Sequence, residues 1–545
     1  MELEQPKTPF TDDSQSESLS QENTASTYMT SLEAINMMNA LREAEANKPR
    51  RARIPGKRSH VLTLDIPEQT IEIKDLLVLD IAKIAEEVGI KLYIVGGYVR
   101  DYLLDRPRTD FDFTVVGDAL EFAEILAKKF KSRAILYPRF KTAMINIGRF
   151  KCEFVGTRKE EYLPNSRNPI VTDGRLEDDL RRRDFTINAI AVSLNKEDFG
   201  TVIDIFKGRN DINKKLIRTP LEPFVTFSDD PLRMMRAARF SAQLGFKVDI
   251  KSIEGIRKMA SRIEIIAQER ITEEFLKILA APVPSIGLKL LFDLGVIRLI
   301  IPELDRLSGI EVKNENGVRY AHKDILQHSF QVLDNIATKT DNIWLRFAAL
   351  FHDIAKPSVK KFIPESGWSF HGHEEFGARL MHKLFNRLRL PVEKLSYVEK
   401  LVRLHQRPMN LVEEGVTDSA VRRLAFHAGD ALEDLFLLCR SDITTNNPEL
   451  NEQYLNNYDI VARKVAEVQE KDKLREFQSP VRGEEIMEIC NLQPCRCVGS
   501  IKTMIEEAIL DGIIPNEYEA AKSYFLENKE KWLDEINHDY ILLKI

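Results

Sequence analysis

Residues 93–113 read YIVGGYVRDYLLDRPRTDFDF, and this stretch decides the fold of the first part of the chain. An apolar run before Gly96 and Gly97 predicts a strand, a helix that begins near Val99, and a second strand with Asp110 and Asp112. Alternate residues of a strand point to the same face. The two carboxylates can therefore hold two Mg²⁺ ions that activate a 3′-hydroxyl and neutralise leaving pyrophosphate. A tight turn and a solvated strand are the structural alternatives.

The surrounding sequence predicts an α/β unit followed by helices. Before the glycines lies an apolar helical segment, LLVLDIAKIAEEVG, and after them come further strand segments, FDFTVV, MINIG and CEFV. Beyond about residue 205 almost every segment has helical periodicity. We therefore expect an α+β protein, with a small mixed-sheet head followed by a long all-helical region.

Composition limits the class of protein. A chain of 545 residues is too long for one core and should form several domains. With 43% hydrophobic residues and no apolar run near the ~20 residues of a membrane helix, it is expected to be a soluble protein. The acidic N-terminus lacks the features of a signal peptide, which favours the cytoplasm. The five cysteines lack CxxC spacing and are expected to be free thiols.

The N-terminal extension has two distinct parts. Residues 1–28 are polar and should be disordered. Residues 48–58 contain six basic side chains and no acid, which would suit RNA phosphates or a solvated linker. The formal net charge of −6 excludes a protein that is basic all over, but it does not exclude a local basic surface.

The first motif resembles a known family. GG, VRD, LL and DFD stand in the order found in class II tRNA nucleotidyltransferases of the DNA polymerase β superfamily, which include CCA-adding enzymes and bacterial poly(A) polymerases. The resemblance implies that Asp110 and Asp112 bind Mg²⁺. It also implies that Gly96, Gly97 and Arg100 contact the nucleotide. Glu153, in CEFVGTR, is the candidate third carboxylate, or else an acid on an exposed strand face.

The second motif of this resemblance is RRDFTINA, residues 182–189. It implies that Arg183 binds phosphate and that Asp184 and Asn188 lie near the ribose. A nearby donor or acceptor is what an enzyme needs to distinguish a ribose from a deoxyribose. A run of arginines on a solvated face is the alternative. The preceding residues 162–169 resemble the flexible loop of CCA-adding enzymes.

The third motif, SDDPLRMMRAARFSAQLGF, resembles the amino-acid template of the family. Asp230 and Arg233 are three residues apart on a predicted helix, so they should share a face and pair with the edge of a base. Arg236 and Arg239 extend that face and are expected to bind nucleotide, although such spacing also occurs in salt-bridged helices. The later segment QERITEEFLKIL, with Glu269, Arg270 and Glu273, is expected to brace this helix.

Histidines mark a second site. Eight of the ten lie between His322 and His427. Imidazoles with carboxylates suit a transition metal, and an aspartate can bridge two ions that hydrolyse a phosphoester. The pattern resembles an HD-domain phosphohydrolase, which implies the following ligands: His328, His352, Asp353, His373, His405 and Asp442. Ni²⁺, Mn²⁺, Co²⁺ or Mg²⁺ are the candidate ions.

These observations predict five regions. They are an N-terminal extension (1–60), a nucleotidyltransferase head (61–205), a helical neck that recognises the base (206–310), an HD domain (311–445) and a helical body and tail for tRNA (446–545). The expected activity is addition of CCA to tRNA from CTP and ATP, with hydrolysis of RNA ends by the HD domain. No membrane and no obligate protein partner are expected. Poly(A) addition, and a phosphohydrolase with an RNA-binding head, are the alternatives.

Overall fold

The computed structural model describes residues 70–108, 110–161, 170–309, 324–363, 367–414, 417–472 and 479–542. Its first part is a mixed sheet in the order β3-β4-β5-β2-β1-β8-β9. The strand bounds are β1 Lys91–Val95, β2 Asp110–Val116, β3 Ala134–Tyr137, β4 Thr142–Ile147, β5 Phe150–Gly156, β8 Ala191–Ser193 and β9 Val202–Ile203. β2 and β5 run parallel while β1 is antiparallel to β2 and β8, so the predicted mixed sheet is confirmed.

The central strand β2 separates the core from the site. Phe111, Phe113 and Val115 are buried in the main core, on the side where helices α2 (Leu76–Glu87) and α4 (Ala119–Lys129) also contribute their apolar residues. Because side chains alternate along a strand, Asp110, Asp112 and Thr114 belong to the opposite face. The short helix α5 (Leu176–Arg181) and Val95 of strand β1 contribute to a separate small apolar cluster. The aspartates therefore lie on the face that α2 and α4 leave uncovered.

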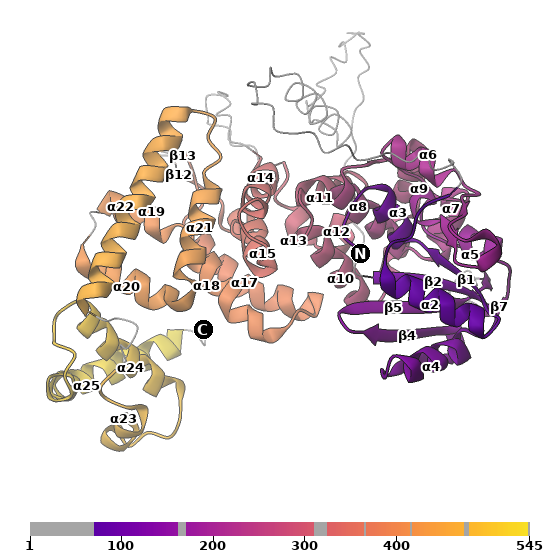
Figure 1. Cartoon of the computed structure of the whole chain (residues 1–545). Helices are drawn as coiled ribbons and strands as arrows, with labels where there is room; N and C mark the ends of the chain where they lie inside the picture. Colours follow the sequence, from indigo (N-terminus) through magenta and orange to yellow (C-terminus); the bar gives the residue numbers. More distant parts are fainter. Residues whose placement is uncertain are drawn as a thin grey trace, which may run out of the picture. The chain divides into compact units, whose positions relative to one another are not determined.

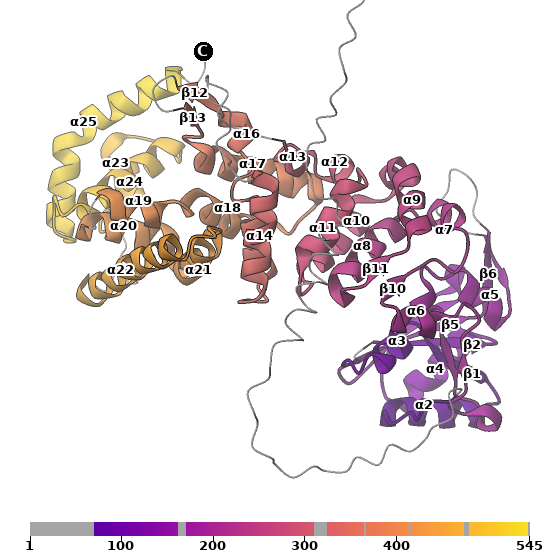
Figure 2. The same ribbon diagram turned by 90° about the horizontal axis from the view of Figure 1, so that it is seen from above.

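The neck is formed by helices α7 Pro223–Asp229, α8 Leu232–Leu244, α9 Ile250–Met259, α10 Gln268–Leu279, α11 Pro284–Asp293, α12 Ile297–Ile300 and α13 Pro302–Asp305. α8 packs against both α10 and α11, and the three lie side by side in Figures 1 and 2. A Cβ atom on Gly287 would lie 2.8 Å from the Ala238 carbonyl oxygen. Glycine is thus what lets α11 approach the α8 backbone so closely.

The histidine-rich region is also helical. Its elements are α14 Ile325–Ala337, α15 Ile343–Phe351, α16 Lys356–Val359, α17 His373–Leu388, α18 Leu395–Leu404, α19 Arg407–Glu414, α20 Asp418–Ala428 and α21 Leu432–Asp442, with the short hairpin β12 Lys361–Ile363 and β13 Gly367–Ser369. Buried Arg346 in α15 donates to the carbonyl oxygens of Leu279 and Ala281, at the end of α10. This side chain satisfies carbonyls at a helix end that would otherwise lack donors.

The last helices are α22 Pro448–Asp472, α23 Gly483–Cys490, α24 Arg496–Leu510 and α25 Tyr518–Leu542. The last three enclose a separate core that contains Ile486, Ile505 and Phe525. Among the described residues, no helix is both long enough and apolar enough to cross a membrane. The five cysteines are all free, as the sequence predicted.

Candidate active sites

Three carboxylates meet in the sheet of the head. In the pairing of β2 with β5, Asp112 lies directly opposite Glu153, and Asp110 lies opposite Lys151. Burial, together with Asp112, raises the pKa of Glu153 above its ordinary value. Burial also raises the pKa of Asp112, and the negative charge of Asp110 raises it further. Carboxylates that are buried close together repel one another and have lost water, and a divalent cation would offset both costs. Divalent cations such as Mg²⁺ also prefer oxygen ligands.

A buried aspartate that the sequence did not single out holds Arg183 beside these carboxylates. The Asp179 side chain is fully buried and accepts hydrogen bonds from Thr114 Oγ1 at 3.1 Å and Arg183 Nη2 at 3.2 Å. Although burial raises the pKa of Asp179, Arg182 and Arg183 bring it below the ordinary value. Gly96 has a φ of 71°, and a Cβ there would lie 2.9 Å from Arg183 Nη1. Both the backbone conformation and the space require a glycine at this position.

The remaining residues of the head motifs form one polar network. Arg100 Nη1 donates to Asn188 Oδ1 at 2.7 Å, and Asn188 Nδ2 donates to Asp184 Oδ1 at 3.0 Å. Arg236 Nε then donates to Asp184 Oδ2 at 2.8 Å. Burial opposes ionisation of Asp184, but Arg236 and Asn188 lower its pKa to about 2. The network therefore joins the second motif to α8 through a permanently ionised carboxylate.

These side chains line one cavity of about 390 Å³. Its cations come from both the head and the neck: Arg100, Arg108, Lys151, Arg183, Arg236, Arg239 and Lys277. The ring of Phe240 also lines it, with the guanidinium carbons of Arg100, Arg236 and Arg239 at 5.0, 5.4 and 4.3 Å from its centroid. A cavity that brings carboxylates and guanidiniums together matches a metal-bound triphosphate, because the carboxylates can hold the metal and the guanidiniums can bind phosphate oxygens.

The structure corrects the expected position of Asp230 and Arg233. α8 begins only at Leu232, because Pro231 ends the preceding segment, and Asp230 has extended backbone angles. The two residues therefore do not share a helix face. Asp230 Oδ2 accepts from Arg270 Nη2 at 3.0 Å, and Arg233 donates to the carbonyl oxygens of Thr226 and Arg182. Neither residue lines the cavity, whereas Arg236 and Arg239 do.

Bracing by α10 uses a residue that the sequence did not indicate. Glu274, which is 3% exposed, lies 2.8 Å from Arg239 Nε and 3.7 Å from Arg236 Nη1. The contact with Arg239 is an ion pair without hydrogen-bond geometry. Glu273, which the sequence favoured, instead pairs with Lys277 at the surface. Burial at positions 274, 275, 278 and 279 shows which face of α10 is inward, and the helical period alone could have identified Glu274.

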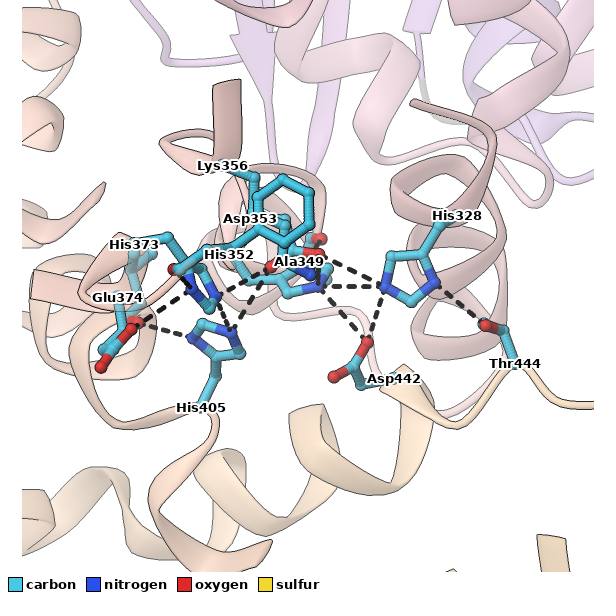
Figure 3. A network of polar contacts seen from close by, with 12 residues as sticks. His328, Ala349, His352, Asp353, Lys356, His373, Glu374, His405, Asp442 and Thr444 are labelled. Atoms are coloured by element: carbon cyan, nitrogen blue, oxygen red, sulfur yellow. Dashed lines mark hydrogen bonds and ion pairs between the residues drawn. The ribbon is translucent and has the colours of Figure 1, made fainter. Parts of the chain in front are cut away.

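In the second site, the six side chains implied by the HD resemblance converge (Figure 3). Asp353 lies between two groups of imidazoles. Its Oδ2 atom is 3.3 Å from His352 Nε2 and 3.6 Å from His328 Nε2. Its Oδ1 atom is 3.2 Å from His373 Nε2 and 3.7 Å from His405 Nε2. Asp442 Oδ1 lies 2.9 Å from His328 Nε2, on the side of His352.

The imidazoles are held in one tautomer. The Nδ1 atoms of His352, His373 and His405 lie 2.7 to 2.9 Å from the carbonyl oxygens of Ala349, Phe370 and Val402. A carbonyl oxygen only accepts, so each Nδ1 carries the hydrogen and each Nε2 presents a lone pair. His352 and His405 are also the residues that cap the C-termini of α15 and α18.

This arrangement fits metal ions. The Nε2 atoms lie only 3.3 Å apart in each of the pairs His328–His352 and His373–His405. The buried Asp353 Oδ1 and Asp442 Oδ1 atoms have no hydrogen-bond donor. A cation about 2.1 Å from each atom would account for both observations. The residues form two overlapping groups of possible ligands, His328–His352–Asp353 and Asp353–His373–His405, with Asp353 in both.

Some predicted features lie outside the described residues. They are the N-terminal extension with its basic run 48–58, the proposed loop at 162–169, and His322.

Three family profiles match the chain in succession. Residues 92–218 match the Poly A polymerase head domain, residues 245–307 match the probable RNA and SrmB-binding site of polymerase A, and residues 325–433 match the HD domain.

Similar proteins carry related names. The chain is 33% identical to the multifunctional CCA protein of Methylococcus capsulatus over 365 residues, which covers 65% of this chain and 81% of that protein. It is 28% identical to the A-adding tRNA nucleotidyltransferase of Deinococcus radiodurans over 436 residues, covering 78% and 93%. A solved tRNA nucleotidyltransferase, complexed with a primer tRNA and an incoming ATP analogue, is 27% identical with a TM-score of 0.51, covering 71% of this chain and 99% of that one. The chain therefore belongs to the tRNA nucleotidyltransferase family of CCA-adding enzymes, in the form that carries an HD domain.

Proposed function

We propose that the protein adds CCA to the 3′ end of tRNA from CTP and ATP. The observation that carries this proposal is the cavity that brings Asp110, Asp112 and Glu153 together with several guanidiniums. Such a cavity suits both divalent metal ions and a triphosphate. Because the substrates are tRNA and nucleoside triphosphates, the proposal places the enzyme in the cytoplasm.

The residues of the head motifs would each have a role in the reaction. Asp110, Asp112 and Glu153 would hold Mg²⁺, which assists attack by a 3′-hydroxyl and stabilises the departing pyrophosphate. Arg183, fixed by Asp179, and Arg100 would bind phosphate oxygens, while Gly96 and Gly97 allow the triphosphate to approach the start of helix α3 (Gly97–Leu103). No side chain has to become a covalent intermediate.

Sugar and base would be recognised deeper in the cavity. Asp184 and Asn188 offer an acceptor and an amide near the position expected for the ribose. Arg236, Arg239 and the face of Phe240 would contact the nucleotide from α8. For Asp230 and Arg233 to pair with a base edge, Asp230 must leave Arg270 and Arg233 must leave its two carbonyls. Base selection would then require a local rearrangement at the start of α8.

The second site is proposed to hydrolyse phosphoesters at RNA ends. Divalent ions held by the six HD residues would supply an activated water for this attack. Imidazole-rich ligands favour Ni²⁺, Co²⁺ or Mn²⁺, although Mg²⁺ remains possible. Asp353 would bridge, because its two oxygens face different imidazole pairs. A 2′,3′-cyclic or terminal phosphate is the substrate class we assign to this site.

The test of the first activity uses tRNA without its 3′ CCA, labelled CTP and ATP, and Mg²⁺. Sequencing the extended product names the reaction: CCA supports the proposal. Addition of A alone, to tRNA that already ends in CC, would assign the activity carried in the name of the Deinococcus radiodurans relative. A long A tract would assign poly(A) addition.

A further inference from the structure

A pair of aromatic side chains beside the HD residues has no part in the ligand set. Trp368 lies in strand β13, and Phe370 directly follows that strand. β13 ends shortly before His373. Each ring has a lysine against it. Lys356 Nζ is 6.0 Å from the centroid of Phe370, and Lys360 Nζ is 4.2 Å from the centroid of Trp368.

The first of these pairs is attached to both groups of metal ligands. Lys356 Nζ donates to Asp353 Oδ2 at 2.7 Å, which places its charge at the bridging carboxylate. The Phe370 carbonyl oxygen accepts the hydrogen of His373 Nδ1 at 2.9 Å. Phe370 is therefore fixed by its backbone next to the centre, while its ring is only partly buried.

The second pair is close to the first in sequence. Trp368 precedes Phe370 by two residues, and Lys360 follows Lys356 by four. The ring of Phe362 in β12 packs edge-on against Trp368, with centroids 5.2 Å apart at 71°. Trp368, Lys360 and Phe362 all remain partly exposed. A hairpin of two three-residue strands gains little stability from its own pairing, and the Phe362–Trp368 contact would help to hold it.

Aromatic rings next to basic groups are how proteins hold single-stranded nucleic acid. The rings stack on bases regardless of sequence, and the cations bind the backbone. Two such pairs, one of them joined to a candidate hydrolytic centre, match two consecutive nucleotides. We propose that Phe370 and Trp368 stack the last and the penultimate base of a single-stranded RNA 3′ end, with Lys356 and Lys360 on its phosphates. This inference rests on the hydrolase function proposed above.

The test compares Phe370→Ala and Trp368→Ala with the metal-loaded full-length protein. The substrate is a short RNA that ends in a 2′,3′-cyclic phosphate. Each variant should raise KM about ten-fold while kcat stays nearly constant, because a stacked base is lost and the ligands are untouched. Phe224→Ala is the matched control, since Phe224 has its own lysine, Lys258, at 5.3 Å but lies in the neck. Its KM should equal that of the wild type.

Abasic substrates assign the bases. If the last nucleotide lacks its base, Phe370→Ala should no longer alter KM, while Trp368→Ala should still raise it. An abasic penultimate nucleotide should reverse that pattern. A KM increase of equal size on intact and abasic RNA, or no increase in either variant, would overturn the subsite.

A measurement of RNA binding distinguishes failure of the RNA subsite from failure of the proposed hydrolase activity. An RNA that ends in a 3′-phosphate should quench the fluorescence of the wild type more than that of Trp368→Phe. If quenching depends on Trp368 but no RNA end is hydrolysed by the wild type, the hydrolase assignment is wrong and the RNA subsite stands. Hydrolysis without such quenching would refute the subsite and leave the hydrolase.

Discussion

Replacing Glu274 with Gln tests whether α10 controls the arginines that line the cavity. The substitution keeps the shape of the side chain but removes the charge that lies 2.8 Å from Arg239 Nε. Arg236 keeps Asp184 at 2.6 Å as a second partner, so the change should act mainly on Arg239. Burial, followed by Arg236, already lowers the pKa of Arg239, and Glu274 opposes this effect.

The magnitude follows from the burial of the pair. Removing one partner of a buried ion pair costs about 3–5 kcal/mol, and the side chains of Glu274 and Arg239 are 4% and 12% exposed. We take the lower end, about 3 kcal/mol, because Arg239 reaches the cavity. At about 2–4 °C per kcal/mol, Tm should fall by roughly 6–12 °C. Loss of a positioned guanidinium from the triphosphate should raise KM for CTP and ATP at least about ten-fold.

The assay measures steady-state addition to tRNA ending in C or CC, together with thermal unfolding. The control is Glu269→Gln, in the first turn of α10, where a 59% exposed side chain pairs with Arg389, a residue outside the cavity. The control should leave both KM and Tm nearly unchanged, because surface pairs contribute little. The reasoning is refuted if Glu274→Gln lowers Tm but keeps the KM of both nucleotides, which would make Glu274 only a stabilising residue.

Three further outcomes are expected. Asp112→Ala should abolish nucleotide addition while tRNA binding, measured by gel shift, persists, and substantial residual turnover would exclude the two-metal assignment. Asp230→Ala should blur the choice among the four nucleotides in single-turnover reactions with little change in Tm, whereas Arg233→Ala should lower Tm as well because it holds two backbone carbonyls. Asp353→Ala should eliminate hydrolysis of cyclic phosphate ends and lower the bound transition metal measured by mass spectrometry, with CCA addition retained. Loss of both activities in a folded Asp353→Ala protein would show that the sites are coupled.

The sequence predicted the parts of the site that depend on local periodicity. Asp110 and Asp112 alternate on a strand, and that period placed them on the uncovered face of the sheet. The period of a single strand could not predict that β2 pairs with β5, because the register of a sheet depends on residues distant in sequence. The role of Glu153, third carboxylate or exposed acid, therefore stayed open until the pairing was known. The clustering of histidines suggested a metal site, and the resemblance to HD-domain phosphohydrolases supplied the six residues that the structure brings together.

The start of α8 was less predictable. A period of three between Asp230 and Arg233 suggested a helix face, but a proline disfavours the helical conformation for the residue before it, so Asp230 is extended and α8 starts at Leu232. Asp179 and Glu274 were also missed. Both are buried acids that pair with arginines. The apolar face of α10 could have indicated Glu274, whereas an acid in a helix as short as α5 looks in sequence like a solvated one.

Two of the HD histidines lie at the C-terminal ends of helices, and their rings also face the candidate metal centre. His352 and His405 close α15 and α18 by donating to carbonyls of the last turn, so folding of those helices already aims both rings. Such preorganisation removes the reorganisation that ion binding would otherwise require. Ions should therefore exchange at this centre without any change in helix content. A chelated protein should regain hydrolysis within the mixing time when Ni²⁺, Co²⁺ or Mn²⁺ is returned, and the same rigid frame should accept each of them in turn.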